Sequence, residues 1–367
     1  MIPGLLGALG LLLLIYRMWP RTFRPCMVQP ASWPLVSIIV PARNEEKVLG
    51  PLLDSLTRLD YPHYEVIVVD DCSDDDTALI ARTYNVRLIR GKERPEGWNG
   101  KQWACHQGAM AAHGSYLLFT DADTVHHTTG LRRVMCEMLN SEAQGFTVLP
   151  QHQNPKFWER LTGPFHALLL AVTNPYGKAR SGQVFAIGQY LVFERKFYER
   201  MGGHTRVRAD WVEDIPLAEA VLADGGRWKV YTGPAVFSVR MYETLSDFIR
   251  GWRRNFRAGM GYSYWGSTFE ITLFITAAIG EGRLNEPYPW LVLLLTWLVL
   301  LRIQNNLGRF SVWGVILLPF SLGLFCYITM LAVYDRVFRR PMNWKNRAYS
   351  AQSAAAKLPQ LGAPESP

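Results

Sequence analysis

The sequence predicts an α/β fold in which a mainly parallel β-sheet is flanked by helices, with further transmembrane helices at the N- and C-terminal ends. Two observations support this prediction. Short β-branched runs alternate with helix-like stretches in the first third of the 367 residues, which is the pattern of a parallel sheet covered on both faces. Apolar residues make up 49% of the chain and gather at its two ends, which indicates a membrane protein with a globular middle.

The expected strands and helices alternate along the chain. They are the strands 36–40, 65–69, 86–89 and 116–120, and the helices 45–56, 75–84 and 101–112. In sheets of this kind, ligands bind outside the carboxyl ends of the strands. Polar clusters that directly follow these strands are therefore candidates for a binding site.

Composition divides the chain into five expected segments. They are an N-terminal membrane anchor at 1–20, a globular domain at 35–245, an interfacial basic helix at 246–267, a C-terminal membrane region at 268–334, and a basic, then disordered, tail at 335–367. Within the membrane region, 290–303 and 312–334 are the clearer spans. The run 268–280 is shorter and contains Glu270, so we expect it to be interfacial or re-entrant, which leaves two or three spans.

The formal net charge of +8 comes partly from basic residues beside the apolar segments. Such placement is typical of the cytoplasmic flanks of membrane spans. We therefore expect a multi-pass protein of the cell membrane with its globular domain on the cytoplasmic face. No zinc-finger or RNP motif is present, and we expect no nucleic-acid partner. The five cysteines include no C-x-x-C pair, which argues against a zinc site or a disulfide framework.

Polar clusters after the first two strands are candidates for nucleotide binding. Pro41, Arg43 and Glu45 follow the first strand, where a strand end leading into a helix can present backbone N–H groups. A proline turn with an Asn cap explains the same residues. Asp70 and Asp71 begin a run with five acids in seven residues. These acids could hold a ribose or base, or form a solvated loop that caps the next helix; their mutual repulsion favours binding.

The segment Gly97–Ala104 is a third candidate. Its glycines allow the backbone to approach a ligand closely, and Lys101 lies at an expected helix start, where it would face phosphate. The spacing of a P-loop is absent. An aromatic loop packed on the core is the alternative.

Asp121 and Asp123 directly follow an apolar strand. Alternate carboxylates on an extended segment can reach one hard cation, and Mg²⁺ or Mn²⁺ prefers oxygen ligands and is often shared with substrate phosphates. The metal would offset charge that develops on a departing diphosphate. The D-x-D pattern alone is common, and its position at a strand end is what indicates a metal site.

Glu213 and Asp214 precede an expected helix. The helix dipole alone favours acids there; the functional interpretation is a general base that deprotonates an acceptor hydroxyl. We prefer Asp214 as the base, with Glu213 as the alternative. Residues that would shape an acceptor pocket lie upstream, although a single histidine is more often structural. They are Gly188, Gln189, Tyr190 and His204.

Arg250 and Arg253 belong to a basic cluster on an expected helix close to the membrane. Clustered guanidinium groups could hold a diphosphate. An interfacial helix that binds lipid headgroups is an equally good interpretation.

These segments, in this order, resemble the glycosyltransferases of family 2, which have the GT-A fold. The resemblance runs from about Val36 to Arg254 and rests on VSIIVPARNEE, VIVVDDCSDDDT, GWNGKQWA, FTDADT, GQYLVFERKFYERMGGH and VEDIPLAEAV. The GW-x-GK-x-WA and GGH…ED-x-x-LA segments are most similar to a membrane-bound branch. That branch includes carotenoid- and hopanoid-associated glycosyltransferases, near the ceramide glucosyltransferases.

The resemblance implies an inverting transfer from a UDP-sugar or similar nucleotide-sugar, with a divalent metal. It implies a nucleotide site at Pro41, Arg43, Glu45 and Asp71 with Lys101 near it, a metal and donor site at Asp121 and Asp123, and a base at Asp214. Many relatives carry (Q/R)-x-x-R-W after the base. Here Arg250 and Arg253 match that motif, but Arg254 replaces the Trp. With few spans to form a channel, we expect transfer of a single sugar to a lipid or other hydrophobic acceptor.

Three other functions stay open at this point. They are a processive polysaccharide synthase, a catalytically inactive membrane-bound module that binds nucleotide-sugars, and a dinucleotide oxidoreductase on a similar sheet. The oxidoreductase is disfavoured because no G-x-G-x-x-G follows the first strand. The retained acids argue against an inactive module.

Overall fold

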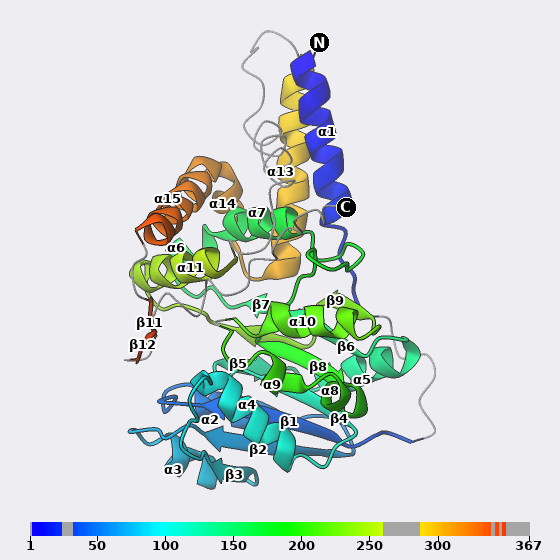
Figure 1. Ribbon diagram of the computed structural model, residues 1–367. Helices are drawn as coiled ribbons and strands as arrows, with labels where there is room; N and C mark the ends of the chain where they lie inside the picture. Colours follow the sequence, from blue (N-terminus) through cyan, green and yellow to red (C-terminus); the bar gives the residue numbers. More distant parts are fainter. Residues whose placement is uncertain are drawn as a thin grey trace, which may run out of the picture.

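The centre of the molecule is a seven-stranded sheet with the order β3-β2-β1-β4-β8-β6-β9 (Figure 1). The computed structural model describes residues 2–23, 32–210, 212–259, 287–338, 342–344 and 347–349. The strands are β1 (Val36–Ala42), β2 (Tyr64–Asp70), β3 (Arg87–Arg90), β4 (Tyr116–Thr120), β6 (Gly145–Leu149), β8 (Tyr190–Glu194) and β9 (Trp228–Thr232). Within this sheet β8 runs antiparallel to both of its neighbours. The sheet is therefore mixed but mainly parallel, which confirms the predicted fold class.

The four strands expected from the sequence are β1 to β4, and the helices between them also form. These helices are α2 (Leu49–Leu56), α3 (Thr77–Arg82) and α4 (Gly100–Ala111). Helix α2 begins four residues later than expected. The reason lies in the preceding loop, where Asn44 has a left-handed backbone with φ of 53° and the backbone N–H of Glu45 donates to Thr77 Oγ1 at 2.8 Å. The N–H of Glu45 is therefore satisfied by the neighbouring loop rather than by a helix.

Two apolar cores cover the two faces of the sheet, because side chains alternate along each strand. On β1, Ile38 and Val40 pack with α2 and with α5 (Gly130–Asn140). Ile39 points to the other face and packs with α4 and with α10 (Asp214–Ala223). The helices therefore hold the carboxyl ends of β1, β2 and β4 along one edge.

A small second sheet with the order β5-β10-β7 lies beside this edge. It contains β5 (Thr124–His126), β7 (Gln151–His152) and β10 (Phe237–Val239). Five further helices belong to this part of the chain. Three are short, namely α6 (Phe157–Arg160), α8 (Arg195–Arg200) and α9 (Gly203–Arg206), and two are longer, namely α7 (Gly163–Thr173) and α11 (Leu245–Gly259).

Apolar helices from both ends of the chain gather on one side of the molecule. Helix α1 (Ile2–Arg17) runs beside α13 (Pro287–Leu307), and both extend away from the sheet (Figure 1). Among the residues that the structure describes, two helices are long and apolar enough to cross a membrane, at Trp290–Leu307 and Leu318–Val337. The apolar stretch Ala8–Arg17 of α1 is shorter.

The span expected at 312–334 is divided into α14 (Val312–Ile316) and α15 (Leu318–Val337). Proline lies in the first turn of α15, where its missing N–H is tolerated but where it cannot continue a preceding helix. A hairpin of β11 (Met342–Trp344) and β12 (Arg347–Tyr349) follows. The run expected at 268–280 and the tail from 351 lie outside the described residues.

The cysteines depart from expectation at one position. Cys136 is disulfide-bonded, whereas Cys72, Cys105 and Cys326 are free. Scattered spacing does not exclude a disulfide, because the fold can bring residues together that are far apart in sequence.

Candidate active site

The loops after β1 and β2 are joined by reciprocal hydrogen bonds. Arg43 Nη1 donates to the carbonyl oxygen of Asp71 at 2.5 Å, and its Nη2 lies 3.9 Å from Asp74 Oδ2. Asn44 Oδ1 accepts from the backbone N–H of Asp74 at 2.9 Å, while its own N–H donates to Ser73 Oγ at 3.0 Å. The structure therefore brings two of the expected nucleotide-binding segments together as one rigid edge.

The other members of this expected set lie along the same edge. Pro41 is still within β1, where it pairs with Val69. Asp70 ends β2, is buried, and accepts the backbone N–H of Ser73 at 3.1 Å. Glu45 lies close enough to Asp123 for its charge to affect the pKa of that residue. The nucleotide loops are therefore adjacent to the D-x-D segment.

The segment Asp121–Asp123 forms a tight turn between β4 and β5. The carbonyl oxygen of Asp121 accepts from Thr124 Oγ1 at 2.9 Å, and Thr120 Oγ1 lies 3.0 Å from Thr124 Oγ1. Both threonines are buried. Their hydroxyl groups fix the turn, so that the two carboxylates on either side of Ala122 project from the strand end.

Lys101 connects this turn to the second pair of acids. Its Nζ lies 2.7 Å from Asp121 Oδ1 and 2.8 Å from Glu213 Oε1. Burial opposes the charged ammonium, but the carboxylates of Asp121 and Glu213 outweigh it and hold the pKa of Lys101 well above its usual range. Burial likewise acts to raise the pKa of Glu213, but Lys101 outweighs this effect and the pKa is lowered. Lys101, whose side chain is 23% exposed, and the buried Glu213 therefore form an ion pair at neutral pH.

Asp214 is held beside this ion pair by the backbone. Its Oδ2 accepts the N–H of Gly188 at 2.9 Å, and its Oδ1 accepts the N–H of Ile215 at 2.7 Å. Burial and the charge of Glu213 raise the pKa of Asp214 to about 7. A carboxylate with this pKa can accept a proton near neutral pH, as a general base must.

Asp123 has a similar pKa but a different environment. Burial, followed by the charges of Asp121 and Glu45, raises its pKa to about 7. Its Oδ1 is buried and has no hydrogen-bond partner within the part of the chain that the structure describes. An unpaired buried carboxylate oxygen is costly, and a bound cation would satisfy it.

Two residues that the sequence interpretation missed position the acid pair. The side-chain amide groups of Asn99 and Gln102 each donate to the carbonyl oxygen of Asp210 at 2.8 Å. Asn99 is the N-cap residue of α4, yet its side chain makes no capping bond. The GWNGKQW segment therefore holds Asp210, three residues before Glu213. The polar Asn and Gln in this segment were the available signal.

The residues expected to shape an acceptor pocket are dispersed. Gly188 lies at the site, where a side chain would approach Glu213 Oε1 to 2.9 Å. Gln189 and Tyr190 are buried, and Tyr190 stacks on Phe237. His204 is buried with its Nδ1 2.5 Å from Tyr198 Oη, an environment that favours a structural role.

The two arginines of α11 form ion pairs elsewhere. Arg250 pairs with Asp247, and Arg253 pairs through two nitrogens with Asp335 of α15. The latter pair ties α11 to an apolar helix. In this structure neither arginine contacts the acids of the site, and their role toward a diphosphate stays a prediction.

Comparison with known proteins agrees with this geometry. The sequence pattern of the family described as "Glycosyl transferase family 2" matches residues 37–202. The chain is 31% identical to the 4,4'-diaponeurosporenoate glycosyltransferase of Staphylococcus aureus strain MRSA252 over 344 residues, which cover 86% of this chain and 88% of the relative. The protein of strain USA300 is 27% identical with the same coverage. The chain belongs to glycosyltransferase family 2.

A solved structure supports the GT-A fold of this family 2 glycosyltransferase. The mannosyltransferase PcManGT from Pyrobaculum calidifontis, in complex with GDP-Man and Mn²⁺, superposes with a TM-score of 0.53 at 19% identity. The alignment covers 91% of this chain and 99% of the mannosyltransferase.

Proposed function

We propose that this glycosyltransferase transfers a single sugar, with inversion, from a nucleotide-diphosphate sugar such as a UDP-sugar to a lipid or other hydrophobic acceptor. One observation carries the proposal. Lys101 joins Asp121 of the D-x-D turn to Glu213 of the second acid pair at 2.7 and 2.8 Å. A donor-binding group and a candidate base are therefore adjacent, as a direct displacement requires.

The nucleotide would lie along the edge formed by the loops after β1 and β2. This edge contains Pro41, Arg43, Glu45, Asp70 and Asp71. Two loops joined by hydrogen bonds form a pre-organised surface, which reduces the entropy lost on binding. Lys101 at the start of α4 would then face the diphosphate, where the helix N-terminus adds favourable N–H groups.

The residues fit a divalent metal, Mg²⁺ or Mn²⁺, shared with the donor. Asp121 and Asp123 would hold it, because Asp123 Oδ1 is buried without a hydrogen-bond partner among the described residues. Those residues contain no group of three or more His, Cys, Asp or Glu side chains that could hold a metal. This fits an ion that completes its coordination with substrate phosphates and water. When bound, such a metal neutralises charge on the departing diphosphate.

Asp214 would act as the base. It removes the proton of an acceptor hydroxyl while the hydroxyl oxygen forms a bond to the anomeric carbon and the bond from that carbon to the diphosphate breaks. Hydrogen bonds from Gly188 and Ile215 orient the Asp214 carboxylate, and burial, together with the charge of Glu213, raises its pKa to about 7. Glu213 is the less suitable base, since its carboxylate is paired with Lys101, which lowers its pKa.

The membrane location and domain plan are proposed together. Two helices of the described part of the chain are long and apolar enough to cross a membrane, and the apolar α1 lies beside one of them, α13. Together they would place residues 35–245 at the surface of the cell membrane, on its cytoplasmic face. The staphylococcal relatives are named for transfer to diaponeurosporenoate, which supports a hydrophobic acceptor here.

The test uses the full chain purified in detergent. A panel of nucleotide-sugars is incubated with it, and release of nucleotide is measured with Mn²⁺, with Mg²⁺ and with chelator. We expect metal-dependent hydrolysis of at least one donor. Lipid mass spectrometry of cells with and without the protein then identifies the glycosylated product. Absence of both hydrolysis and a product would contradict the proposed function.

A further inference from the structure

Helices α13 and α15 are both long and apolar enough to cross a membrane, but they have different neighbours. Helix α13 runs beside the apolar α1, and both extend away from the sheet (Figure 1). Helix α15 packs against α7 and α11 and is steeply inclined to α13 in Figure 1. A helix that crosses a bilayer takes its packing partners into the hydrocarbon with it, so these neighbours decide which helix can cross.

Helix α11 is a highly charged neighbour. Its 15 residues include one acid and four arginines, namely Asp247, Arg250, Arg253, Arg254 and Arg257. Charged side chains are costly in the hydrocarbon of a bilayer, and pairing does not remove the cost of taking them out of water. Helix α11 therefore suits the membrane surface, where water and headgroups surround its arginines, and not the bilayer interior.

Helix α15 is attached to α11 at two places. The rings of Phe256 and Phe325 have their centroids 5.2 Å apart. Arg253 pairs through two nitrogens with Asp335, which lies further along α15. The helix between Phe325 and Asp335 rises by about 15 Å, which is half of the roughly 30 Å thickness of the hydrocarbon. An α15 that crossed the membrane would therefore draw the arginines of α11 into the bilayer.

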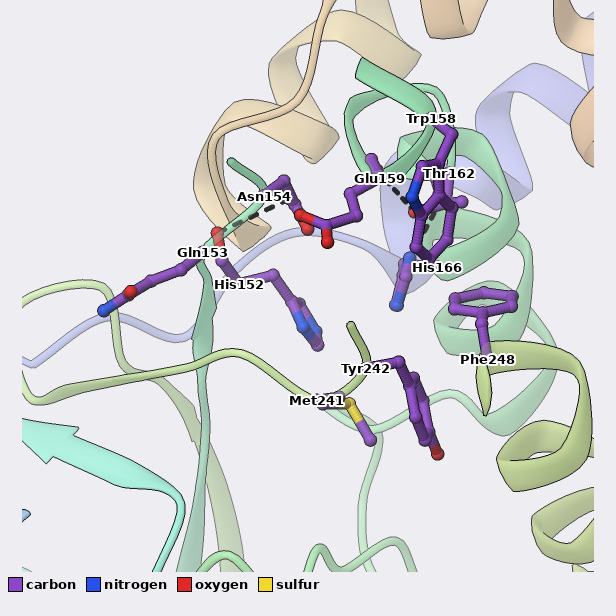
Figure 2. Close-up of a pocket in the computed structure, with 10 residues that line it drawn as sticks. All are labelled: His152, Gln153, Asn154, Trp158, Glu159, Thr162, His166, Met241, Tyr242 and Phe248. Atoms are coloured by element: carbon purple, nitrogen blue, oxygen red, sulfur yellow. Dashed lines mark hydrogen bonds between the residues drawn. The ribbon is translucent and has the colours of Figure 1, made fainter. Parts of the chain in front are cut away.

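Helix α11 is also fixed to the globular part of the chain. Phe248 of α11 lies at the edge of a small pocket, with Trp158 of α6 and His166 of α7 (Figure 2). Its ring centroid is 5.9 Å from that of Trp158 and 6.0 Å from that of His166. The fully buried Phe165 of α7 contacts the same ring, with centroids 5.1 Å apart. Helix α11 cannot follow α15 into a membrane without breaking these contacts.

The face of α15 that points away from these helices is exposed and apolar. The residues of α15 that are buried against the protein recur at helical spacing and include Leu324 and Ile328. The exposed residues fall on the opposite face, and they include Phe320, Tyr327, Met330, Val333 and Val337. One face packed on protein and one free apolar face are typical of a helix that lies in the membrane interface.

This exposed surface continues onto α14, which precedes α15 in the chain. Val312 and Trp313 of α14 are exposed, and tryptophan is enriched at the border between membrane and water. Exposed arginines lie at both ends of the surface: Arg309 precedes α14, and Arg336 is in the last turn of α15. Their guanidinium groups suit the phosphates of lipid headgroups. The apolar surface and its basic ends therefore match a bilayer surface.

We propose that α14 and α15 lie along the surface of the bilayer, with the exposed face of α15 at the boundary between headgroups and acyl chains, and that α15 does not cross the membrane. The inference rests on the membrane location within the proposed function and adds an orientation to it. Of the two candidate spans in the described part of the chain, α13 alone crosses. Helices α7 and α11 then lie between the membrane surface and the sheets (Figure 1).

Depth measurements on spin-labelled variants test this orientation. The variants Phe320→Cys, Tyr327→Cys and Val337→Cys are made in a full chain that also carries Cys72→Ser and Cys326→Ser, which remove the exposed free thiols. The chain is placed in vesicles of phosphatidylcholine and phosphatidylglycerol, and depth is obtained from relaxation by oxygen and by a nickel chelate. We expect the three labels to lie in the bilayer at depths within about 5 Å of one another.

A crossing α15 gives a different pattern. Tyr327 is near the middle of the helix, so its label would lie about 10 Å deeper than the labels at Phe320 and Val337. That result would overturn the proposal, as would three labels in water. Thermal unfolding of each variant shows that it is folded.

Helix α13 provides the matched control, because Leu291 and Leu298 are exposed to similar degrees, 56% and 52%. These positions differ by about 10 Å of helical rise. In a helix that crosses the bilayer, the label of Leu298→Cys should therefore lie about 10 Å deeper than that of Leu291→Cys.

The side of the membrane on which α15 ends is an independent measurement. Gly308 forms a β-bridge with His152, so α13 ends on the side of the globular domain, and an α15 that does not cross keeps Arg336 there. In sealed vesicles with the globular domain outward, an impermeant maleimide should label Arg336→Cys, in the Cys326→Ser chain, to the same extent as Cys72. Labelling of Cys72 with Arg336→Cys protected until detergent is added would overturn the proposal.

Failure of this inference can be told apart from failure of the proposed function. If the labels of α13 and α15 all lie in water, the proposed membrane location is wrong. If α13 crosses and the Tyr327 label is the deepest in α15, only the orientation of α15 is wrong. Hydrolysis of a nucleotide-sugar by the wild-type chain reports on the transferase separately from either result.

Discussion

Two pairs of acids face each other across Lys101, and they differ in how their second member is satisfied. In each pair one carboxylate contacts the ammonium: Asp121 in the D-x-D turn and Glu213 at the start of α10. The other carboxylate has its pKa raised to about 7. Asp214 nevertheless accepts two backbone N–H groups, whereas Asp123 Oδ1 has no such partner among the described residues.

This difference indicates different chemistry for two similar motifs. A carboxylate that is oriented by the backbone and close to neutrality is prepared to take a proton. A buried carboxylate oxygen without a donor is prepared for a cation. Four measurements test whether Asp214 and Asp123 have these separate roles.

The largest effect is expected from Asp214→Asn. The amide keeps the shape of the side chain but cannot accept a proton, so we expect the rate of transfer to a hydroxyl acceptor to fall about a thousandfold. Nucleotide binding, measured by calorimetry, should stay near the wild-type value. Transfer at more than a tenth of the wild-type rate would remove Asp214 as the base and return attention to Glu213.

Asp123→Asn should act through the metal instead. We expect Mn²⁺ binding in the presence of UDP, followed by electron paramagnetic resonance, to be lost, and transfer to fall about a hundredfold. Asp214→Asn is the matched control and should bind Mn²⁺ as the wild type does. Equal loss of Mn²⁺ binding in both variants would show that the two acid pairs do not have separate roles.

The sequence predicted the features that depend on neighbouring residues along the chain, but not the contacts between residues far apart in the sequence. The strand ends that carry Asp71 and Asp121 were predicted, because local apolar patterns determine where strands begin and end. The D-x-D and E-D acids were also identified as metal and base candidates from their positions at a strand end and a helix start. The fold class agreed for the same reason, since alternating strands and helices restrict the arrangements that can bury their apolar faces.

The connections between the two pairs were not predicted. Lys101 was assigned to phosphate, and its bridge to Glu213 joins residues more than a hundred positions apart. The sheet between them is also non-local, since β8 inserts antiparallel between β4 and β6. No local pattern encodes that strand order. The bond from Asn99 to Asp210 is likewise long-range. The ion pair of Arg253 with Asp335 depends on the packing of an apolar helix against α11.

The pH dependence of transfer should test the assignment of the base on a smaller scale. Asp214 acts only when it is deprotonated, and its pKa is raised to about 7. The rate should therefore rise with pH, by about tenfold between pH 6 and pH 8, and level off above this range. Initial rates at saturating donor, with nucleotide binding measured at each pH, provide the test. A rate that is already constant from pH 5 would mean that the base has an ordinary carboxyl pKa.

The smallest effect is expected from Gly188→Ala, which disturbs the place where the two acid pairs meet. The added methyl group would lie 2.9 Å from Glu213 Oε1 and 3.2 Å from Lys101 Nζ. Both side chains would have to shift by a few tenths of an ångström, while the Gly188 N–H would still reach Asp214. We expect the turnover number to fall about fivefold with little change in nucleotide affinity. Gly50→Ala is the control, because its nearest atom, Tyr84 Oη, is at an ordinary 3.7 Å. A Gly188 variant with wild-type turnover would show that the Lys101–Glu213 pair need not be held closely, and would leave the orientation of Asp214 to its backbone hydrogen bonds alone.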